Sequence, residues 1–328
     1  MPLVDLFGRS HEYLRISVTD RCNLHCRYCV PSEGIKFQRR EDILSFEEIE
    51  LLSRIFVSSG IKKIRITGGE PLLREGVETL CSSLSSIEEL HSLAMTTNGV
   101  LLAEKITSLK HRGIQQLNIS LDTLQQRRFE LVTKRASFNN VLRGIESAIL
   151  AGFEEVKINT VVMRNFNDDE LLDFVAFAKS LSLNVRFIEF MPFFGNGWNH
   201  GRFVSFIEMK KIIETQFTLV PKQNEQILPG PAKEFSVDGS NATIGFITTM
   251  SDHFCNDCNR LRISATGIIR NCLFAQNGID IKTPLRNGAT MNELEMLIRS
   301  SVISKWEKHP EESELVQLQQ QSMIGIGG

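Results

Sequence analysis

The feature that most constrains the fold is a repeated alternation of β-rich runs and helical stretches between residues 13 and about 215. The β-rich runs are 13–18, 62–67, 92–97, 116–121, 155–162 and 184–190. The helical stretches between them are 46–59, 75–86, 102–112, 138–151 and 168–181. Such alternation predicts a parallel sheet with helices on its outside. We therefore expect an α/β fold built on an incomplete (β/α)6 barrel of the TIM-like type.

The predicted strands are polar on one face, which is unusual for parallel strands that are covered on both sides. In the first strand, Leu14 and Ile16 alternate with polar residues, and later strands repeat this pattern. Burying polar groups without partners costs about 1–3 kcal/mol each. We expect the polar face to line the barrel and bind a polar ligand, although an internally paired polar network is an alternative. Arg15, Arg65 and Lys157 favour an anionic ligand such as a phosphate ester.

Three cysteines follow the first predicted strand at the spacing C-x3-C-x2-C, namely Cys22, Cys26 and Cys29. Thiolates at this spacing bind soft metal centres, and three of them on a [4Fe–4S] cluster leave one iron open for a small molecule. A purely structural cluster is one alternative. A zinc site completed by His25 is another, but His25 lies between two of the cysteines and next to Cys26.

A second group of three cysteines, Cys255, Cys258 and Cys272, has the spacing C-x2-C-x13-C. A zinc ribbon needs a second C-x2-C pair, and only one further cysteine, Cys272, follows the pair here. His253 would have to complete a zinc site. We favour a second three-cysteine iron–sulfur cluster. The remaining cysteine, Cys81, lies in a helical stretch and is expected to be buried.

Composition excludes several function classes. The net charge of −2 argues against a general nucleic-acid binder. No run of about 18 apolar residues predicts a membrane span, and residues 1–5 do not resemble a secretory signal. The odd number of cysteines, in two tight groups, argues against a disulfide framework. We expect a cytoplasmic protein with reduced thiols and no membrane partner.

We expect two domains in the 328 residues. Residues 1–215 form the partial barrel with the first cysteine group. Residues 216–328 form a C-terminal, β-rich domain that carries the second group and closes the barrel mouth, with β-like runs in 217–250 and a helix at 290–307. The loop 193–203 is a lid or a connector. By itself, a terminal Gly-Gly predicts only a frayed end.

The first cysteine group resembles the signature of the radical S-adenosylmethionine (SAM) superfamily. Its marks are the aromatic Tyr28 before Cys29 and the Gly68-Gly69-Glu70 sequence after the second strand. This resemblance implies that a [4Fe–4S] cluster binds SAM at its open iron. Reduction of the cluster then cleaves SAM to a 5′-deoxyadenosyl radical, while the protein binds and orients.

The whole chain resembles the GTP 3′,8-cyclase family of molybdenum cofactor biosynthesis. The motifs are the first cysteine group, 65–71 (RITGGEP), 96–99 (TTNG), 118–122 (NISLD), 156–160 (VKINT), 186–189 (RFIE), 255–262 (CNDCNRLR) with Cys272, and the terminal Gly-Gly. The resemblance implies conversion of GTP to (8S)-3′,8-cyclo-7,8-dihydroguanosine 5′-triphosphate. The radical would remove hydrogen from C3′ of the ribose, the C3′ radical would add to C8 of guanine, and reduction would then give the dihydro product.

The resemblance also implies roles for individual residues. SAM would contact Tyr28, Gly69, Ser120 and Met191. GTP would contact Arg15, Arg65, Thr96, Lys157, Arg260, Leu261 and Arg262. Two [4Fe–4S] clusters would be held by Cys22, Cys26 and Cys29, and by Cys255, Cys258 and Cys272. The residues implied in catalysis are Arg260, Arg262, Gly327 and Gly328, the last two as a tail that reaches into the active site.

The partners implied by the resemblance are GTP, a reductant such as flavodoxin or ferredoxin, and the downstream cyclic pyranopterin monophosphate synthase. The chain would be a monomer or a homodimer. Two other functions fit parts of the sequence. A radical SAM peptide maturase would need more C-terminal cysteines, and a metal sensor or structural zinc protein would not need a polar barrel interior.

Overall fold

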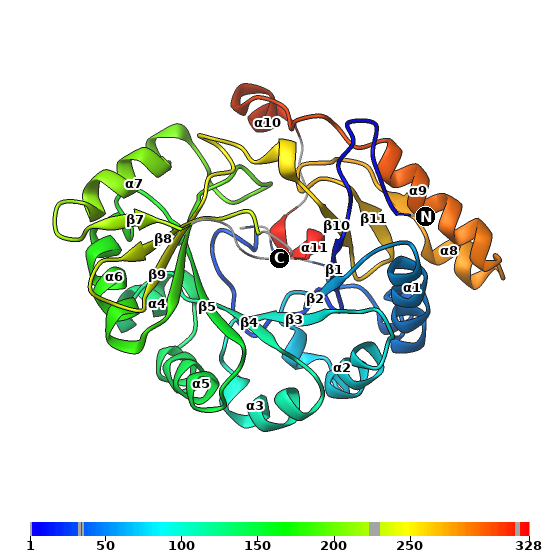
Figure 1. Cartoon of the computed structure of the whole chain (residues 1–328), viewed down its shortest axis with the longest axis horizontal. Coiled ribbons are helices and arrows are strands. Elements are labelled where there is room, and N and C mark those ends of the chain that lie inside the picture. Colours follow the sequence, from blue (N-terminus) through cyan, green and yellow to red (C-terminus); the bar gives the residue numbers. More distant parts are fainter. Residues whose placement is uncertain (1, 32–33, 35, 223–229, 319–321, 328) are drawn as a thin grey trace.

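The computed structural model describes residues 2–31, 34, 36–222, 230–318 and 322–327. Its centre is a curved sheet of twelve strands in the order β12-β11-β10-β1-β2-β3-β4-β5-β6-β9-β8-β7 (Figure 1). The predicted parallel strands are confirmed to within one residue at either end. They are β1 (Tyr13–Ser17), β2 (Lys63–Thr67), β3 (Ser92–Thr97), β4 (Gln116–Ser120), β5 (Glu155–Val162) and β6 (Asn184–Glu189).

The predicted helices lie on the outside of the curve, as Figure 1 shows. They are α1 (Phe46–Ser58), α2 (Val77–Ser85), α3 (Leu102–His111), α5 (Phe138–Leu150) and α6 (Leu171–Leu181). Helix α1 begins with a capping box, in which the backbone N–H of Glu48 donates to Ser45 Oγ and the N–H of Ser45 donates to Glu48 Oε2. The sequence did not predict α4 (Gln126–Thr133), because eight residues with few apolar positions carry little helical periodicity.

The core lies between the sheet and these helices. Neighbouring strands align their apolar residues, so that Leu14 pairs with Ile64 and Ile16 with Ile66. All four side chains are buried, and each such burial contributes about 1.5–3 kcal/mol. The alternate, polar residues of the same strands are therefore directed to the inside of the curve.

The C-terminal half supplies strands to both edges of the sheet. Strand β9 (Thr243–Ile247) runs parallel to β6, and β10 (Arg260–Ile263) runs parallel to β1. Eight adjacent strands are thus parallel. The remaining four, which pair antiparallel, are β7 (Leu219–Pro221), β8 (Lys233–Val237), β11 (Ile268–Arg270) and β12 (Ile279–Asp280).

The prediction of a (β/α) barrel with a C-terminal β-rich extension is confirmed, with one correction. The strands within 217–250 continue the sheet beyond β6 and do not cross the barrel mouth as expected. Without β9, strand β6 would be an open edge with unpaired backbone N–H and C=O groups. Strand β9 forms hydrogen bonds with these groups. The outermost described strands, β12 and β7, are not hydrogen-bonded to each other, so the sheet is not closed. The domain boundary at residue 215 stays a prediction.

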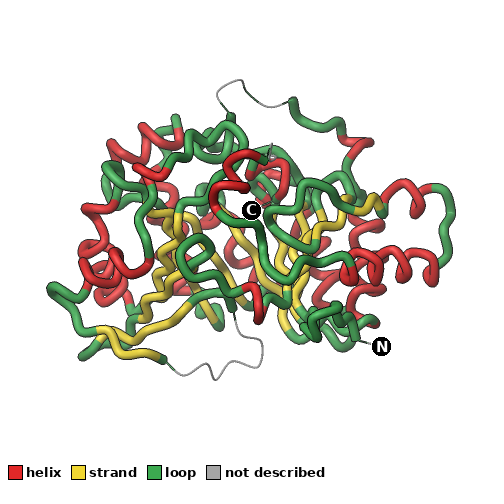
Figure 2. Tube along the Cα trace, turned by 90° about the horizontal axis from the view of Figure 1, so that it is seen from above, coloured by secondary structure: helices red, strands yellow, loops and turns green. Residues whose placement is uncertain are grey.

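Five further helices complete the described chain: α7 (Phe206–Ile213), α8 (Lys282–Arg286), α9 (Met291–Ile303), α10 (Glu312–Gln317) and α11 (Met323–Ile326). Helix α9 confirms the helix predicted at 290–307. Figures 1 and 2 both place α11 near the middle of the molecule, over the strands of the sheet. Among the described helices, none combines the length and apolarity needed to traverse a lipid bilayer.

Candidate active site

One cavity of about 310 Å³ takes lining residues from all eight parallel strands. Both cysteine groups line it, although more than 220 residues separate them in the sequence. Most other predicted site residues line it as well: Tyr28, Gly69, Ser120, Met191, Arg15, Arg65, Thr96, Lys157, Arg260 and Arg262. Leu261 differs, because its side chain is in the hydrophobic core behind β10. Gly328 lies outside the described residues.

The first cysteine group lies in the loop 22–29, which backbone hydrogen bonds hold from two sides. The N–H groups of His25 and Arg27 donate to the carbonyls of Thr133 and Val132, at 2.9 and 3.1 Å. On the other side, the Gly68-Gly69-Glu70 segment packs against residues 19–21. A Cβ on Gly69 would lie 2.3 Å from the carbonyl oxygen of Arg21, so only glycine permits this contact.

The three thiols of this loop suit an iron–sulfur cluster better than a single metal ion. Among the described residues, no three His, Cys, Asp or Glu side chains converge as ligands of one ion. In a [4Fe–4S] cluster each cysteine binds a different iron, so the sulfur atoms need not share one ion. His25, the candidate fourth zinc ligand, does not line the cavity that the cysteines line. The side-chain amide of Asn98 donates to Cys22 Sγ at 3.6 Å and to Asn23 Oδ1 at 2.7 Å.

Tyr28, the aromatic residue of the motif, connects the cysteine loop to the sheet. Its hydroxyl donates to Asp122 Oδ2 at 2.5 Å, and the N–H of Val161 donates to Asp122 Oδ1 at 2.9 Å. Burial raises the pKa of Asp122 to about 6, while these hydrogen bonds oppose the shift. Asp122 belongs to the NISLD motif but was not predicted as a site residue.

Besides Arg260 and Arg262 on β10, five cations line the cavity from β1, β2, β5 and β6. The alternation of the predicted strands placed Lys63 on the polar face with Arg65, two residues further on β2, and the structure confirms this. The sequence singled out only Arg15, Arg65 and Lys157 for an anionic ligand, and it missed Arg186. Arg65 Nη1 donates to the carbonyl of Met95 at 2.9 Å, which fixes its guanidinium. Arg186 Nη2 donates to Glu234 Oε1 at 2.6 Å, and Lys157 is paired with Glu155.

The electrostatics of this wall favour an anion. Burial raises the pKa of the Tyr13 phenol, but the charges of Arg65, Arg15 and Lys63 outweigh it and lower this pKa to about 7. Burial and the charge of Arg186 lower the pKa of Lys157 to about 8, despite its carboxylate partner. Excess positive charge is therefore concentrated here, and a phosphate group would stabilise it.

Buried polar atoms without partners also line the cavity. Thr96 Oγ1, Asn118 Oδ1 and Asn159 Oδ1 accept or donate no hydrogen bond within the described chain, although all three side chains line the cavity. They stand on β3, β4 and β5, three adjacent strands. An unsatisfied buried group costs about 1–3 kcal/mol. These atoms therefore fit a polar ligand, such as a nucleoside, and Asn118 and Asn159 pair in register with Lys157 and Arg186 on the neighbouring strands.

The C-terminal tail closes one side of this cavity. Met323 and Ile324 line it, and Arg262 Nη1 donates to the carbonyl of Gly327 at 3.2 Å. Gly327 has a φ of 84°, and a Cβ there would lie 2.4 Å from Ser17 Cβ on β1. The tail is therefore packed against the sheet at Gly327 and is not a frayed end there.

GTP affinity should fall as the pH rises above 8, because of Lys157. The pKa of about 8 in the free protein lies below the ordinary lysine value, so the ammonium is lost from about pH 8 upward. A bound triphosphate would favour the protonated ammonium, so binding above this pH takes up a proton. GTP affinity therefore falls by up to about tenfold per pH unit. Calorimetry between about pH 7 and pH 9, without SAM, measures this.

Two variants test the assignment to Lys157. Lys157→Met should bind GTP weakly and lose most of the pH dependence. Tyr13→Phe removes the other group that titrates nearby, and it should keep the dependence above pH 8. A Lys157→Met protein with wild-type affinity and pH profile would show that the lysine does not contact the phosphates.

Two family models match the chain, and each covers one of the two cysteine groups. The family model "Radical SAM superfamily" matches residues 16–178, and "Molybdenum Cofactor Synthesis C" matches residues 183–311. The chain is 44% identical to the mitochondrial GTP 3′,8-cyclase of Arabidopsis thaliana over 99% of this chain and 83% of that protein. It is also 44% identical to the GTP 3′,8-cyclase of Moorella thermoacetica, over 98% and 99% of the two chains.

The chain belongs to the GTP 3′,8-cyclase family. It is therefore a radical SAM enzyme, of a family that uses SAM, a [4Fe–4S] cluster and an additional C-terminal cluster. The peptide-maturase and zinc-protein alternatives are set aside. Molybdenum cofactor biosynthesis protein 1 of Mus musculus is 45% identical over 99% of this chain, but the chain spans only 51% of that protein's length.

Solved structures support the fold of this GTP 3′,8-cyclase family member. Streptococcus suis SuiB bound to S-adenosylmethionine superposes with a TM-score of 0.60 over 88% of this chain and 68% of that one, at 15% identity. The structure of anSMEcpe with bound AdoMet and Cp18Cys peptide gives a TM-score of 0.61 over 93% and 83%, also at 15% identity. At such low identity the likeness concerns the fold alone.

Proposed function

We propose that this chain converts GTP to (8S)-3′,8-cyclo-7,8-dihydroguanosine 5′-triphosphate, the first step of molybdenum cofactor biosynthesis. The observation that carries the proposal is a single cavity lined by both three-cysteine groups and by seven cations that stand on its strands. Such a cavity suits a substrate that carries both a triphosphate and a base. Family membership supports the same reaction.

The first cysteine loop would hold the cluster that binds SAM. When bound, the reduced cluster and SAM would supply a 5′-deoxyadenosyl radical for hydrogen removal at C3′ of GTP, and the reductant would supply the further electron that, with a proton, gives the dihydro product. Around it, Gly69 would offer backbone groups, and Ser120 and Met191 would contact SAM from β4 and from the end of β6. The hydrogen bond from Tyr28 to Asp122 would fix the aromatic ring of the motif beside the cluster.

The cation wall would orient GTP for cyclisation. Arg15, Arg65 and Lys157 would bind the triphosphate, with Lys63 and Arg186 as further candidates. The ribose would lie near the unpartnered Thr96, Asn118 and Asn159 atoms. The guanine would face Cys255, Cys258 and Cys272, beside Arg260 and Arg262. Holding C3′ and C8 of one molecule close together is where proximity would contribute most.

Leu261 would contact GTP through its backbone and not through its side chain. The side chain is fully buried in the core, so only its backbone groups can reach GTP from β10. Its neighbours on the strand, Arg260 and Arg262, direct their side chains to the cavity, as the alternation of a strand requires.

Metal analysis and SAM cleavage test this function together. The protein is purified without oxygen and reconstituted, and iron and acid-labile sulfide are counted. About eight irons per chain are expected for two [4Fe–4S] clusters. 5′-Deoxyadenosine should form from SAM only when GTP is present. GTP-independent cleavage would put the substrate in doubt, and zinc without sulfide would overturn the radical mechanism.

The electron donor is proposed to be a small acidic protein such as flavodoxin or ferredoxin. Arg27, Lys134 and Arg135 are exposed beside the first cysteine loop, and within the described chain they form no ion pair. Backbone hydrogen bonds join their two segments, and Arg135 Nε also donates to the carbonyl of Asn23. A basic surface here would attract an acidic partner to the cluster that must be reduced.

Charge reversal at this surface should slow electron delivery. In an Arg27→Glu, Lys134→Glu protein, turnover with flavodoxin at low salt should fall by about tenfold or more, since such steering changes association rates by 10–10³. Turnover with dithionite should be unchanged. Lys211→Glu on α7, an exposed lysine elsewhere, is the matched control. Equal flavodoxin rates in the double variant and the control would exclude this docking surface.

Three further properties complete the proposal. The product would pass to cyclic pyranopterin monophosphate synthase. The chain would work in the cytoplasm, which the free thiols of all seven cysteines support. It would act as a monomer or homodimer, which size-exclusion chromatography with light scattering decides.

A further inference from the structure

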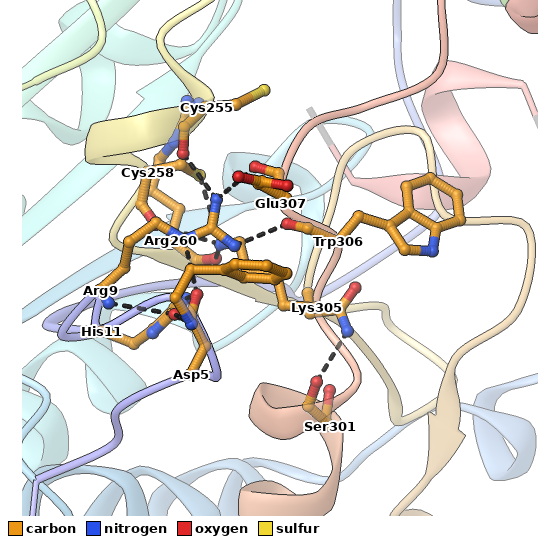
Figure 3. A network of polar contacts seen from close by, with 12 residues as sticks. Asp5, Arg9, His11, Cys255, Cys258, Arg260, Ser301, Lys305, Trp306 and Glu307 are labelled. Carbon is orange, nitrogen blue, oxygen red and sulfur yellow. Dashed lines mark hydrogen bonds and ion pairs between the residues drawn. The ribbon is translucent and has the colours of Figure 1, made fainter.

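The second cysteine group is surrounded by polar contacts that no step of the proposed reaction uses (Figure 3). Cys255 and Cys258 lie on the turn before β10. A nearby segment, residues 305–309, follows α9 and contacts both of them. The backbone N–H of His309 donates to the sulfur of Cys255, and Lys305 Nζ donates to Cys258 Sγ at 3.3 Å.

Lys305 is held by more than this contact. Its ammonium also donates to the carbonyls of Cys258 and Arg260, at 3.2 and 3.0 Å. The residue is only 5% exposed. Three acceptors therefore occupy the three N–H groups of the ammonium, which fixes its position.

The charge of Lys305 has no carboxylate partner. Among the described residues, no Asp or Glu oxygen lies within ion-pair distance of its Nζ, and the nearby charged groups include the cations Arg9 and Arg260 (Figure 3). A buried ammonium costs several kcal/mol unless an opposite charge compensates it. When a cluster is bound, the sulfur ligand of Cys258 offers negative charge in direct contact with this ammonium, Cys272 adds to it, and the nearby Asp5 is paired with Arg9.

Arg9 holds the segment that carries Lys305. Its Nη1 donates to the carbonyls of Cys255 and Glu307, both at 2.7 Å, and its Nη2 donates to that of Trp306 at 2.6 Å. Its Nε donates to Asp5 Oδ2 at 2.6 Å, and Asp5 also accepts from the backbone N–H of Arg9. One guanidinium thus joins the turn with Cys255 to the chain just after Lys305.

We propose that Lys305 is a positioning residue that raises the reduction potential of the second [4Fe–4S] cluster, and that Arg9 keeps it in contact with Cys258. The inference rests on the proposed function only in requiring that the second cluster is bound. Reduction by a one-electron donor adds one negative charge to the cluster. A fixed cation on a ligand sulfur stabilises that charge, and hydrogen bonds to sulfur and local charge both set cluster potentials.

Replacing Lys305 by the neutral Met tests the proposal directly. The two clusters are titrated in the reconstituted full-length protein and followed by electron paramagnetic resonance. The signal of the second cluster is identified in a Cys22→Ser, Cys26→Ser, Cys29→Ser protein. At a fixed potential, Lys305→Met should lower the ratio of reduced to oxidised second cluster at least tenfold, a shift of about 59 mV downward. The first cluster should not shift.

Two control variants separate charge from packing. Lys305→Arg keeps the charge and should keep a potential near that of the wild type. Lys308→Met removes an exposed lysine three residues further along the same segment, where it is ion-paired with Glu311. It should leave the potential of the second cluster unchanged. An unshifted potential in Lys305→Met, or an equal shift in Lys305→Arg, would overturn the proposal.

The variant may also change cluster retention, which the iron count detects. If Lys305→Met binds only the first cluster, the potential of the second cluster is tested with Lys305→Arg alone. Recovery of the second cluster at the wild-type potential supports the proposal, and failure to recover it overturns it. Because GTP-dependent SAM cleavage by the unmodified protein is measured separately, failure of this inference is distinct from failure of the proposed function.

Discussion

A Cys26→Ser protein is expected to lose SAM cleavage completely while it keeps its fold and its second cluster. Serine retains the size of cysteine but not the thiolate that binds iron. The side chain lies in the loop 22–29, which is held by backbone hydrogen bonds that the substitution does not touch. Iron should fall from about eight to about four atoms per chain, and 5′-deoxyadenosine should not form.

Cys81→Ala is the matched control for this experiment. Cys81 is fully buried in α2, outside both cysteine groups, and contacts only the hydrophobic core. It should keep all the iron and all the SAM cleavage. A Cys26→Ser protein that retains about eight irons and cleaves SAM would contradict the assignment of the first cluster.

A Gly327→Ala protein is expected to bind SAM and both clusters but to turn over GTP about 10²-fold more slowly. The backbone at residue 327 has a positive φ, and the added methyl group would overlap the side chain of Ser17. The tail must move, and Arg262 then loses its hydrogen bond to the carbonyl of residue 327. Displacement of groups around the substrate by about 1 Å is enough for a loss of this size.

Gly325→Ala, in the exposed turn of α11, is the control for tail substitutions and should turn over GTP at nearly the wild-type rate. Initial rates of 5′-deoxyadenosine formation at saturating GTP measure both variants. A wild-type rate for Gly327→Ala would mean that the tail does not position the substrate.

Local patterns in the sequence predicted the central fold well. The β1–β6 strands and the helices between them follow from hydrophobic periodicity and capping residues, which are local signals. The edge strands were harder to predict. Their pairing with β1 and β6 is a long-range contact, and the short runs within 217–250 indicate strands without indicating their neighbours. Helix α4 was missed because so few of its side chains are apolar.

The site residues also divide into those that local sequence patterns predict and those that depend on long-range contacts. The cysteine spacings and the polar alternation of the strands identified the cavity and most of its lining. The alternation placed Lys63 on the polar face, and Arg186 could have been found in the same way. The contacts of Arg9 and Lys305 could not, because they join residues that are 246 and 47 positions apart in the sequence. Such contacts depend on the folded arrangement of the N-terminal segment, the second cysteine turn and the end of α9.

The most direct test of the proposed reaction is to follow the hydrogen at C3′ of GTP. GTP deuterated at that position is turned over with SAM and a reductant in the absence of oxygen, and the 5′-deoxyadenosine is analysed by mass spectrometry. If this chain cyclises GTP as proposed, the 5′-deoxyadenosine gains one deuterium and the cyclised product lacks it. If GTP-dependent 5′-deoxyadenosine forms without deuterium, hydrogen is taken from another position and the proposed reaction is wrong.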